Sequence, residues 1–383
     1  MSIKSVKLAL SYLSGCVLIF ILGISWQRAD AEELYQIHKS IRSLGMGGAG
    51  VASTFNSDVL FINPAGLADV RGMNFTMMDP YVGLSGLDIL EQAQSVQNSA
   101  DFSATLQQFY GSPAWLGGGA KAAALFSNVG FAYYTDVDAS LRIDNPVFPE
   151  LQLNVVQDYG LALGAGFQVH DNVSTGVVIK QINRKGVRET YRASTIGDLN
   201  PDQIFGNLDN AGKGYSADLG VNLIFDRTTN ATMSFVWKDI GTTKFRVENG
   251  GVAPPSDPDE MIVGLAATID GGLFSITPAL DFRGLNRNDV PIGKKVNFGV
   301  EVGLPLLDVR AGFHQGYYTL GAGLNVGLLR VEAATYGVEL GEYPGQLEDR
   351  RYLLQIALEF GVDSNWLNFS GNQGRRNRLK QRR

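Results

Sequence analysis

The stretch that decides the fold reads Ser40-Ile41-Arg42-Ser43-Leu44-Gly45-Met46-Gly47-Gly48-Ala49-Gly50-Val51-Ala52, and after a polar span it continues as Asn63-Pro64-Ala65-Gly66-Leu67. Neither part keeps the 3.6-residue period of a helix or the two-residue period of a strand. Glycine permits close approach of backbones, and an asparagine before a proline is a turn signal. The sequence therefore predicts a compact, irregular segment here.

A competing motif runs through the same residues. Gly45, Gly47 and Gly50 match the pattern G-x-G-x-x-G, the fingerprint of dinucleotide-binding folds. Those folds require a buried strand before the glycines and a helix after them. Residues 39–43 are too polar for a buried strand, and Pro64 soon ends any helix. We therefore reject a nucleotide site.

Residues 1–31 have the pattern of a cleavable export signal. Lys4 and Lys7 give a charged start, residues 8–24 are mostly apolar, and Ala29-Asp30-Ala31 is a small-x-small cleavage site, with cleavage expected after Ala31. A single membrane anchor is the alternative, because the apolar run is near spanning length. Residues 13–16 also resemble a lipoprotein box, but the apolar core continues beyond the cysteine instead of ending before it.

Composition narrows the class of protein further. Cys16 is the only cysteine, so the chain after the signal has no disulfide, no thiolate nucleophile and no cysteine metal ligand. Removing the signal changes the formal charge from −6 to −8, which gives no reason to expect a nucleic-acid partner. No later run reaches the roughly 18 apolar residues of a membrane helix. We therefore expect an exported membrane β-barrel, with a soluble periplasmic β-protein as the alternative.

The chain after residue 71 reads as alternating strands and connections. Residues 73–78 alternate as a first strand, and residues 84–110 carry apolar positions at helical spacing, which predicts a helical excursion in the first long loop. From there, short turns and long loops alternate along the chain. The one exception is 314–316, a short connection at a place where the alternation predicts a long loop. That alternation is typical of bacterial outer-membrane barrels, and it gives about 14 strands with both termini on the periplasmic side.

The segment 352–360 illustrates the strand chemistry. One face holds Tyr352, Leu354, Ile356, Leu358 and Phe360, and the other holds Leu353, Gln355, Ala357 and Glu359. The first face suits lipid and the second suits a lumen. A final aromatic resembles the C-terminal signal read by the barrel-insertion machinery, although further residues follow it here.

The glycine-rich segment resembles the N-terminal signature of the FadL-like outer-membrane barrels. It is most similar to the PorV/PorQ branch, which opens with Arg-Ser-x-Gly-Met-Gly-Gly-Ala-x-x-Ala and then Asn-Pro-Ala-x-Leu. The resemblance covers about 28 residues and is diffuse elsewhere. It implies a 14-stranded antiparallel barrel, a plug folded into the lumen, and an Asn-Pro-Ala turn just before the first strand.

The resemblance and the strand pattern together give a domain organisation. We expect a signal at 1–31, a periplasmic start and luminal plug at 32–70, the transmembrane barrel at 71–361, and a basic, disordered periplasmic tail at 362–383. The residues that we single out for plug contact or ligand passage are Met46, Gly47, Gly48, Phe55, Phe61, Asn63, Pro64, Ala65 and Leu67. Simple packing of the apolar ones against the wall is the alternative.

We find no pattern for an enzyme or a cofactor. The three histidines, His38, His170 and His314, have no metal-ligand or triad spacing. The acidic run 257–260 could bind a divalent cation weakly, but it lacks the ligand pattern of a calcium site, so we expect a solvated loop. Basic loop residues could hold an anionic headgroup at the outer mouth, or could meet lipopolysaccharide phosphates or solvent; they are Arg283, Arg287, Lys294, Lys295, Arg350 and Arg351.

Two functions from different classes remain open. The first is FadL-like passage of a hydrophobic or amphipathic small molecule across the outer membrane. The second, which follows the more similar PorV branch, is a non-transporting scaffold or shuttle for exported proteins. The expected partners are outer-membrane lipid and lipopolysaccharide, the insertion machinery during biogenesis, and either a hydrophobic ligand or a secreted protein.

Overall fold

The computed structural model describes residues 38–86, 111, 113–144, 150–192, 210–247, 252–363 and 366–368. The expected signal at 1–31, most of the expected helical excursion at 84–110 and most of the expected tail lie outside these residues. Within the described part, no helix is both long and apolar enough to cross a membrane.

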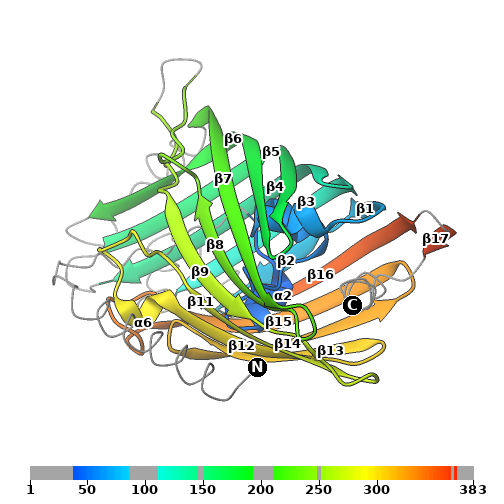
Figure 1. The fold of residues 1–383 in the computed structure, drawn as a ribbon. Coiled ribbons are helices and arrows are strands. Elements are labelled where there is room, and N and C mark those ends of the chain that lie inside the picture. Colours follow the sequence, from blue (N-terminus) through cyan, green and yellow to red (C-terminus); the bar gives the residue numbers. More distant parts are fainter. Residues whose placement is uncertain are drawn as a thin grey trace.

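The described strands form one closed antiparallel sheet (Figure 1). They are β1 Met73–Met78, β2 Tyr81–Leu84, β3 Ala114–Phe126, β4 Val129–Asp144, β5 Glu150–His170, β6 Val173–Arg192, β7 Ala211–Asp226, β8 Ala231–Lys238, β9 Glu260–Ala266, β10 Ile269–Asp270, β11 Ser275–Phe282, β12 Val296–Gly303, β13 Leu307–His314, β14 Tyr317–Val326, β15 Leu329–Glu339, β16 Glu348–Asp363 and β17 Trp366–Asn368. The fold class predicted from the sequence is confirmed.

Two of the wall strands are interrupted. β1 and β2 both pair with β16 on one side and with β3 on the other, so together they close the barrel. β9 and β10 pair one after the other with the same side of β11. Counting each broken pair once, and leaving out β17, gives 14 wall strands among the described residues. β17 pairs back on the end of β16, so regular structure extends past residue 361.

Short turns collect at one end of the barrel and longer connections at the other. β3 and β4 are joined by Ser127-Asn128, and β14 and β15 by Gly327-Leu328. Connections at the opposite end, such as 340–347, are longer. The two-residue link Gln315-Gly316 is the exception expected from the sequence, and both of its residues have positive φ, as a tight hairpin turn requires. The long-loop end corresponds to the outer face of a bacterial barrel.

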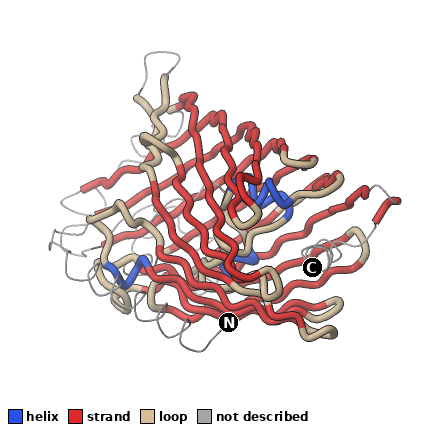
Figure 2. The backbone as a smooth tube through the Cα atoms, in the orientation of Figure 1, coloured by secondary structure: helices blue, strands red, loops and turns tan. Residues whose placement is uncertain are grey.

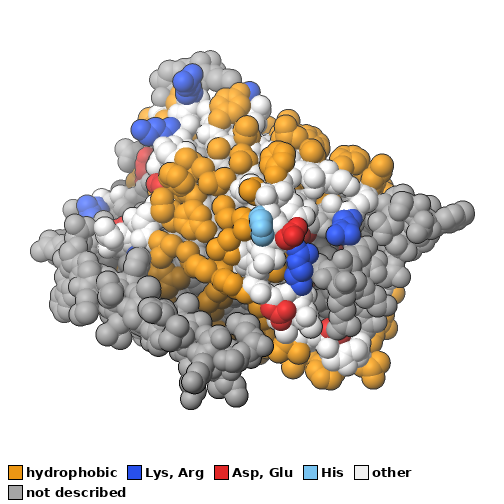
Figure 3. Space-filling model, viewed as in Figure 1, with side chains coloured by type: hydrophobic (Ala, Val, Ile, Leu, Met, Phe, Trp, Pro, Cys, Tyr) orange, Lys and Arg blue, Asp and Glu red, His pale blue; other side chains and the backbone are white. Residues whose placement is uncertain are grey.

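The outward faces of the strands form an apolar band. In β16, Tyr352, Leu354 and Ile356 are exposed while Leu353 and Ala357 are buried inside, as the alternation predicted. Hydrophobic side chains cover a broad belt across the strands that face the viewer in Figure 3. Such a belt between two polar ends is the surface that a bilayer requires.

The chain before β1 lies inside this barrel, and we call residues 38–72 the luminal segment. It contains α2 Ile41–Gly45 and the 3-10 helices η1 Asn56–Leu60 and η2 Pro64–Asp69. The sequence predicted an irregular segment, but Ser40 caps α2, and Asn63 caps η2 with Pro64 in its first turn. Regular structure is limited to these single turns. A further short helix, α6 Ile292–Lys295, lies at the long-loop end.

Candidate functional site: the luminal segment and its seats

The luminal segment crosses the barrel from one wall to the other. α2 lies against β13, β14, β15 and β16, whereas η1 and η2 lie against β3, β4, β5, β6 and β7. The two groups of strands occupy different arcs of the closed sheet. Figures 1 and 2 show the helical turns enclosed by the ring of strands. The segment therefore occludes the lumen between the two arcs.

Glycines in β12, β13 and β14 form a flat contact surface for the Gly-Met-Gly motif. We call such a group of wall glycines a glycine seat. A Cβ on Gly299 would lie 2.5 Å from the carbonyl carbon of Met46, and one on Gly312 would lie 2.7 Å from the nitrogen of Gly47. Gly321 and Gly45 are also close to each other, since a Cβ on either would lie 3.0 Å from the other's Cα. Real Cβ contacts are essentially never shorter than 3.0 Å, so at positions 299 and 312 only glycine lets the motif lie flat on the wall.

A second glycine seat in β5, β6 and β7 receives the Asn-Pro-Ala turn. A Cβ on Gly176 would lie 2.9 Å from the nitrogen of Ala65, and one on Gly220 would lie 2.8 Å from the same atom. A Cβ on Gly166 would lie 2.7 Å from the carbonyl carbon of Leu67. Both sequence motifs of the luminal segment therefore have a matching set of glycines in the wall.

Asn63 fixes the second motif by hydrogen bonds. Its side-chain amide donates to the carbonyl of Val51 at 2.7 Å and to Oδ1 of Asn222 at 2.8 Å. Its own Oδ1 accepts from the backbone of Ala65 at 3.0 Å. Asn63 is 1% exposed, so all of these bonds are shielded from water. One side chain thus joins the turn, the preceding loop and β7.

Asp281 of β11 holds the loop that follows the first motif. Its Oδ2 accepts hydrogen bonds from the backbone nitrogens of Gly50 at 2.7 Å and Val51 at 3.1 Å. A carboxylate that accepts two adjacent N–H groups in a buried site makes a strong, oriented anchor. The sequence reasoning did not single out Asp281.

An ion-pair chain leads from α2 into the wall. Arg42 donates to both oxygens of Glu301, at 2.8 and 3.1 Å, and Arg310 donates to Glu301 at 2.7 Å. Arg310 also reaches Glu332 at 2.9 Å. All four side chains are buried, so the pairs are screened little by solvent.

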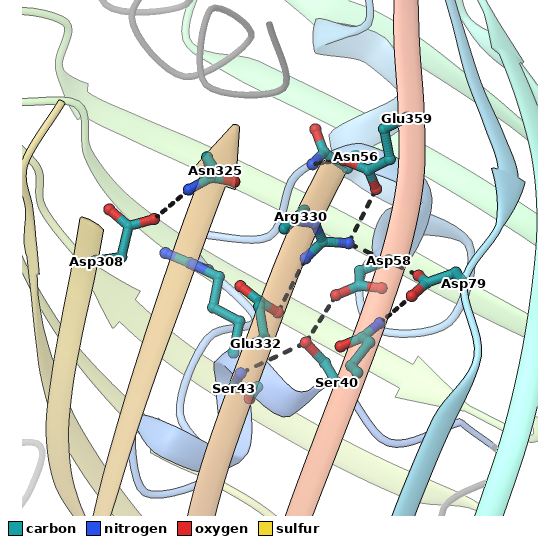
Figure 4. A network of polar contacts seen from close by, with 12 residues as sticks. Ser40, Ser43, Asn56, Asp58, Asp79, Asp308, Asn325, Arg330, Glu332 and Glu359 are labelled. Atoms are coloured by element: carbon teal, nitrogen blue, oxygen red, sulfur yellow. Dashed lines mark hydrogen bonds and ion pairs between the residues drawn. The ribbon is translucent and has the colours of Figure 1, made fainter. Parts of the chain in front are cut away.

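Figure 4 shows how this series of ion pairs continues from the barrel wall back to the luminal segment. Arg330 lies between Glu332 and Glu359, at 2.9 Å from each. Glu359 accepts a hydrogen bond at 3.1 Å from the side chain of Asn56, in η1. Alternating charges in β12, β13, β15 and β16 therefore connect α2 to η1 of the luminal segment.

A second polar cluster surrounds the start of the segment. Lys121 of β3 pairs with Asp58, and its Nζ lies 2.7 Å from Nε2 of His38. Burial and the Lys121 ammonium both lower the pKa of His38, so its ring is neutral at pH 7 and Nε2 accepts from the lysine. Burial alone would raise the pKa of Asp58, but Lys121 holds it well below its usual range. Asp58 therefore stays ionised, and Ser40 donates to it at 2.7 Å.

The structure buries all of the predicted site residues except Phe55. Met46, Phe61, Ala65 and Leu67 are buried, and Met46 packs against Ala279 of the wall. Gly47, Gly48, Asn63 and Pro64 lie at the two seats, with Gly47 and Gly48 at positive φ. Phe55 is half-buried, and the Arg42 guanidinium lies 4.6 Å from its ring centroid.

Two cavities adjoin the luminal segment near the short-turn end. One, of about 60 Å³, lies between the segment and strands β7 to β11, and the other, of about 10 Å³, lies beside Arg330. Arg42, Thr54 and Phe55 line both, so the loop 50–56 is the partition between them. Hydroxyl and amide side chains make up half of the residues that line the larger cavity: Ser53, Thr54, Asn63, Asn222, Asn230, Thr232, Thr268 and Thr277.

The basic residues expected at the outer mouth do not form an anion clamp. Arg283 pairs with Glu260 at 2.8 Å, and Arg351 pairs with Asp349 at 2.7 Å. Arg287 pairs with Asp289, and Arg350 with Glu348. Lys294 and Lys295 donate to backbone carbonyls. Neighbouring carboxylates or carbonyls thus already satisfy these cations.

The acidic run at 257–260 is likewise engaged. Asp257 receives two hydrogen bonds from Arg184, at 2.6 and 2.7 Å, and Glu260 receives two from Arg283. Over the described residues, no group of three or more carboxylate or histidine side chains is arranged to hold a metal ion. The run is therefore a structural part of the mouth and not a solvated loop.

Comparisons with known proteins give distant likenesses of fold. No family model matches the chain, and no curated protein matches it. The crystal structure of the Pseudomonas putida toluene transporter TodX is 12% identical, with 87% of this chain and 99% of that chain covered and a TM-score of 0.47. The CymD monoaromatic hydrocarbon channel is 10% identical, with 84% and 97% covered and a TM-score of 0.47. A Pseudomonas aeruginosa FadL homologue is 11% identical, with 85% and 99% covered and a TM-score of 0.33. Likenesses at this level do not decide a ligand or a family.

Proposed function

We propose that this barrel is a FadL-like outer-membrane channel for a hydrophobic or amphipathic small molecule, closed in this structure by the luminal segment. The observation that carries the proposal is that the loop 50–56 separates two cavities inside a lipid-facing barrel. Movement of this loop would join them, whereas the helical turns on either side are held on glycine seats. The hydroxyl and amide lining of the larger cavity favours an amphipathic molecule within this class.

The resemblance of the N-terminal signature adds support to the FadL-like assignment. The same signature is most similar to the PorV/PorQ branch, so a scaffold for exported proteins is the second candidate. The observation that favours the scaffold is the extent of anchoring, since Arg42, Asn63 and Asp281 all tie the segment to itself or to the wall. A plug that never moves suits a scaffold, and a plug that moves suits a channel.

A reversible tether separates these two candidates. A Cβ on Gly264 of β9 would meet the Cγ2 atom of Val51, so cysteines at the two positions would have Cβ atoms within about 4 Å, the separation that a disulfide needs. The only natural cysteine, Cys16, lies in the expected signal, so the engineered pair would be free of competing thiols. The experiment compares V51C/G264C with V51C alone, each oxidised and then reduced.

The assay is uptake of radiolabelled oleate or toluene into proteoliposomes. If the loop 50–56 must move, the oxidised double variant loses uptake and a reductant restores it, while the single variant is unaffected by either treatment. Full uptake with the disulfide formed would refute a moving loop. No uptake of either probe by the parent, with a stoichiometric protein partner recovered from the native membrane, would replace the channel by the scaffold.

A further inference from the structure

The apolar band on β7 has a defined upper edge. Its outward residues run from Tyr215 to Phe225, which are 65% and 66% exposed, and the outward positions between them are apolar. An aromatic residue at each end of about ten residues is the pattern of the two membrane interfaces of a barrel strand. Tyr215 lies toward the long-loop end, so it marks the outer interface.

Four cationic side chains lie just beyond this edge, on two neighbouring strands and an extended segment beside them. Lys185 is on β6, Lys213 is on β7, and Lys244 and Arg246 are on the extended segment 243–246 beside β7. Backbone pairing sets their common outward face, because Lys213 and Arg246 exchange hydrogen bonds at 3.0 and 2.9 Å. Blue side chains are visible beyond the hydrophobic belt at the top of Figure 3.

The position of the segment 243–246 is fixed from inside the barrel. Phe245, between the two cations, points inward and is 7% exposed, with the Arg184 guanidinium 4.5 Å from its ring centroid. Arg184 also binds Asp257, on the returning side of the same loop, at 2.6 and 2.7 Å. The outward cations Lys244 and Arg246 are therefore held in place and are not carried on a free loop.

No acidic side chain of the described residues forms an ion pair with this group. Among the described residues, none of Lys185, Lys213, Lys244 and Arg246 forms an ion pair, whereas the mouth residues Arg283, Arg287, Arg350 and Arg351 all do. Lys213 and Arg246 face each other directly across the backbone pair, and like charges so placed destabilise a sheet. An anion at this surface would convert that repulsion into attraction.

We propose that these four residues, called the interface patch, bind the phosphates of lipid A in the outer leaflet. Strands are about 4.8 Å apart, so the patch spans about 10 Å, which is wide enough to contact more than one phosphate. Lysine and arginine are the side chains that recognise phosphate, and Tyr215 sets the depth at which acyl chains give way to headgroups. The patch is independent of what passes through the lumen.

Native mass spectrometry of the purified barrel with added lipid A tests the proposal. The patch variant is K185Q/R246Q, and the matched control is R71Q/R227Q, which removes the same charge at the short-turn end. We expect the parent and the control to retain lipid A, and the patch variant to bind it at least tenfold more weakly. Lipid A lacking one phosphate should bind the parent more weakly than the intact lipid.

Three results would overturn the proposal. They are parental binding by the patch variant, an equal loss in the control, which would indicate net charge alone, and equal binding of intact and partly dephosphorylated lipid A. The heat-dependent gel mobility of each folded barrel establishes that all variants are folded.

Discussion

Gly299→Ala tests whether the wall glycines seat the luminal segment. The new Cβ would lie 2.5 Å from the carbonyl carbon of Met46 and 2.6 Å from its Cα. These are backbone atoms and cannot rotate away. Ordinary contact begins at 3.4 Å, so Met46 must retreat by about 1 Å.

That retreat has two costs. Overpacking of a close-packed site costs about 1–3 kcal/mol. The shift also weakens the contacts on each side of Met46, namely the hydrogen bond from Thr319 to the Gly45 carbonyl at 3.0 Å and the His314 contact with the Gly47 carbonyl at 3.3 Å. Each such bond contributes about 1 kcal/mol. We therefore expect the free energy of unfolding to fall by about 2–4 kcal/mol.

Guanidinium unfolding in detergent micelles, followed by tryptophan fluorescence, measures this change. Trp115 belongs to the apolar cluster that contains Ile41 and Leu44, so it reports on the luminal segment. The control is Gly118→Ala in β3, where the nearest atom to the new Cβ is 3.5 Å away and stability should change by less than about 0.5 kcal/mol. Equal stability of the two variants would refute the tight seat.

Three further changes probe the anchors. Arg42→Met removes both hydrogen bonds to the buried Glu301 and should lower the free energy of unfolding by about 3–5 kcal/mol; parental stability in guanidinium would contradict this. Asp281→Asn should weaken the anchor of the loop by about 1–3 kcal/mol and speed hydrogen exchange of the two luminal amides that it binds, and unchanged exchange would count against it. Burial alone would raise the pKa of Asp58, but Lys121 lowers it, so its stabilisation is complete above the unfolded-state pKa of about 4 and is lost as the pH falls through the lower folded-state pKa. Asp58→Asn should therefore flatten the pH dependence of unfolding below about pH 4, and a dependence like the parent's would exclude this role.

The strand pattern was available from the sequence because it is local. In residues 352–360 the alternation of apolar and polar side chains assigns each face without knowledge of any other strand. The alternation of short and long connections is equally local and predicts the closed antiparallel barrel. The Asn-Pro-Ala turn was also visible, because its amide cap and its proline act within three residues.

Only part of the candidate site could be predicted from the sequence. The glycine and asparagine motifs of the luminal segment were singled out, but Asp281, Glu301 and the seat glycines were not. The strands did carry one pattern that pointed to these wall residues. In several strands, charged residues and glycines occupy the inward-facing positions. That pattern marks a polar, closely approached lumen, but it does not say which residue meets which.

The sequence by itself determined the elements whose causes lie within a few residues: the strands, their lipid-facing sides and the turns, including the Asn-Pro-Ala turn. Only the tertiary structure decided the partners of the luminal segment. Arg42 and Glu301 are 259 residues apart, and the Gly50 nitrogen and Asp281 are 231 apart. Closure of the barrel brings them together, because strand pairing fixes which inward side chains face the same part of the lumen. Likewise, Lys213 and Arg246 become a cationic pair only when the loop after β8 folds back beside β7.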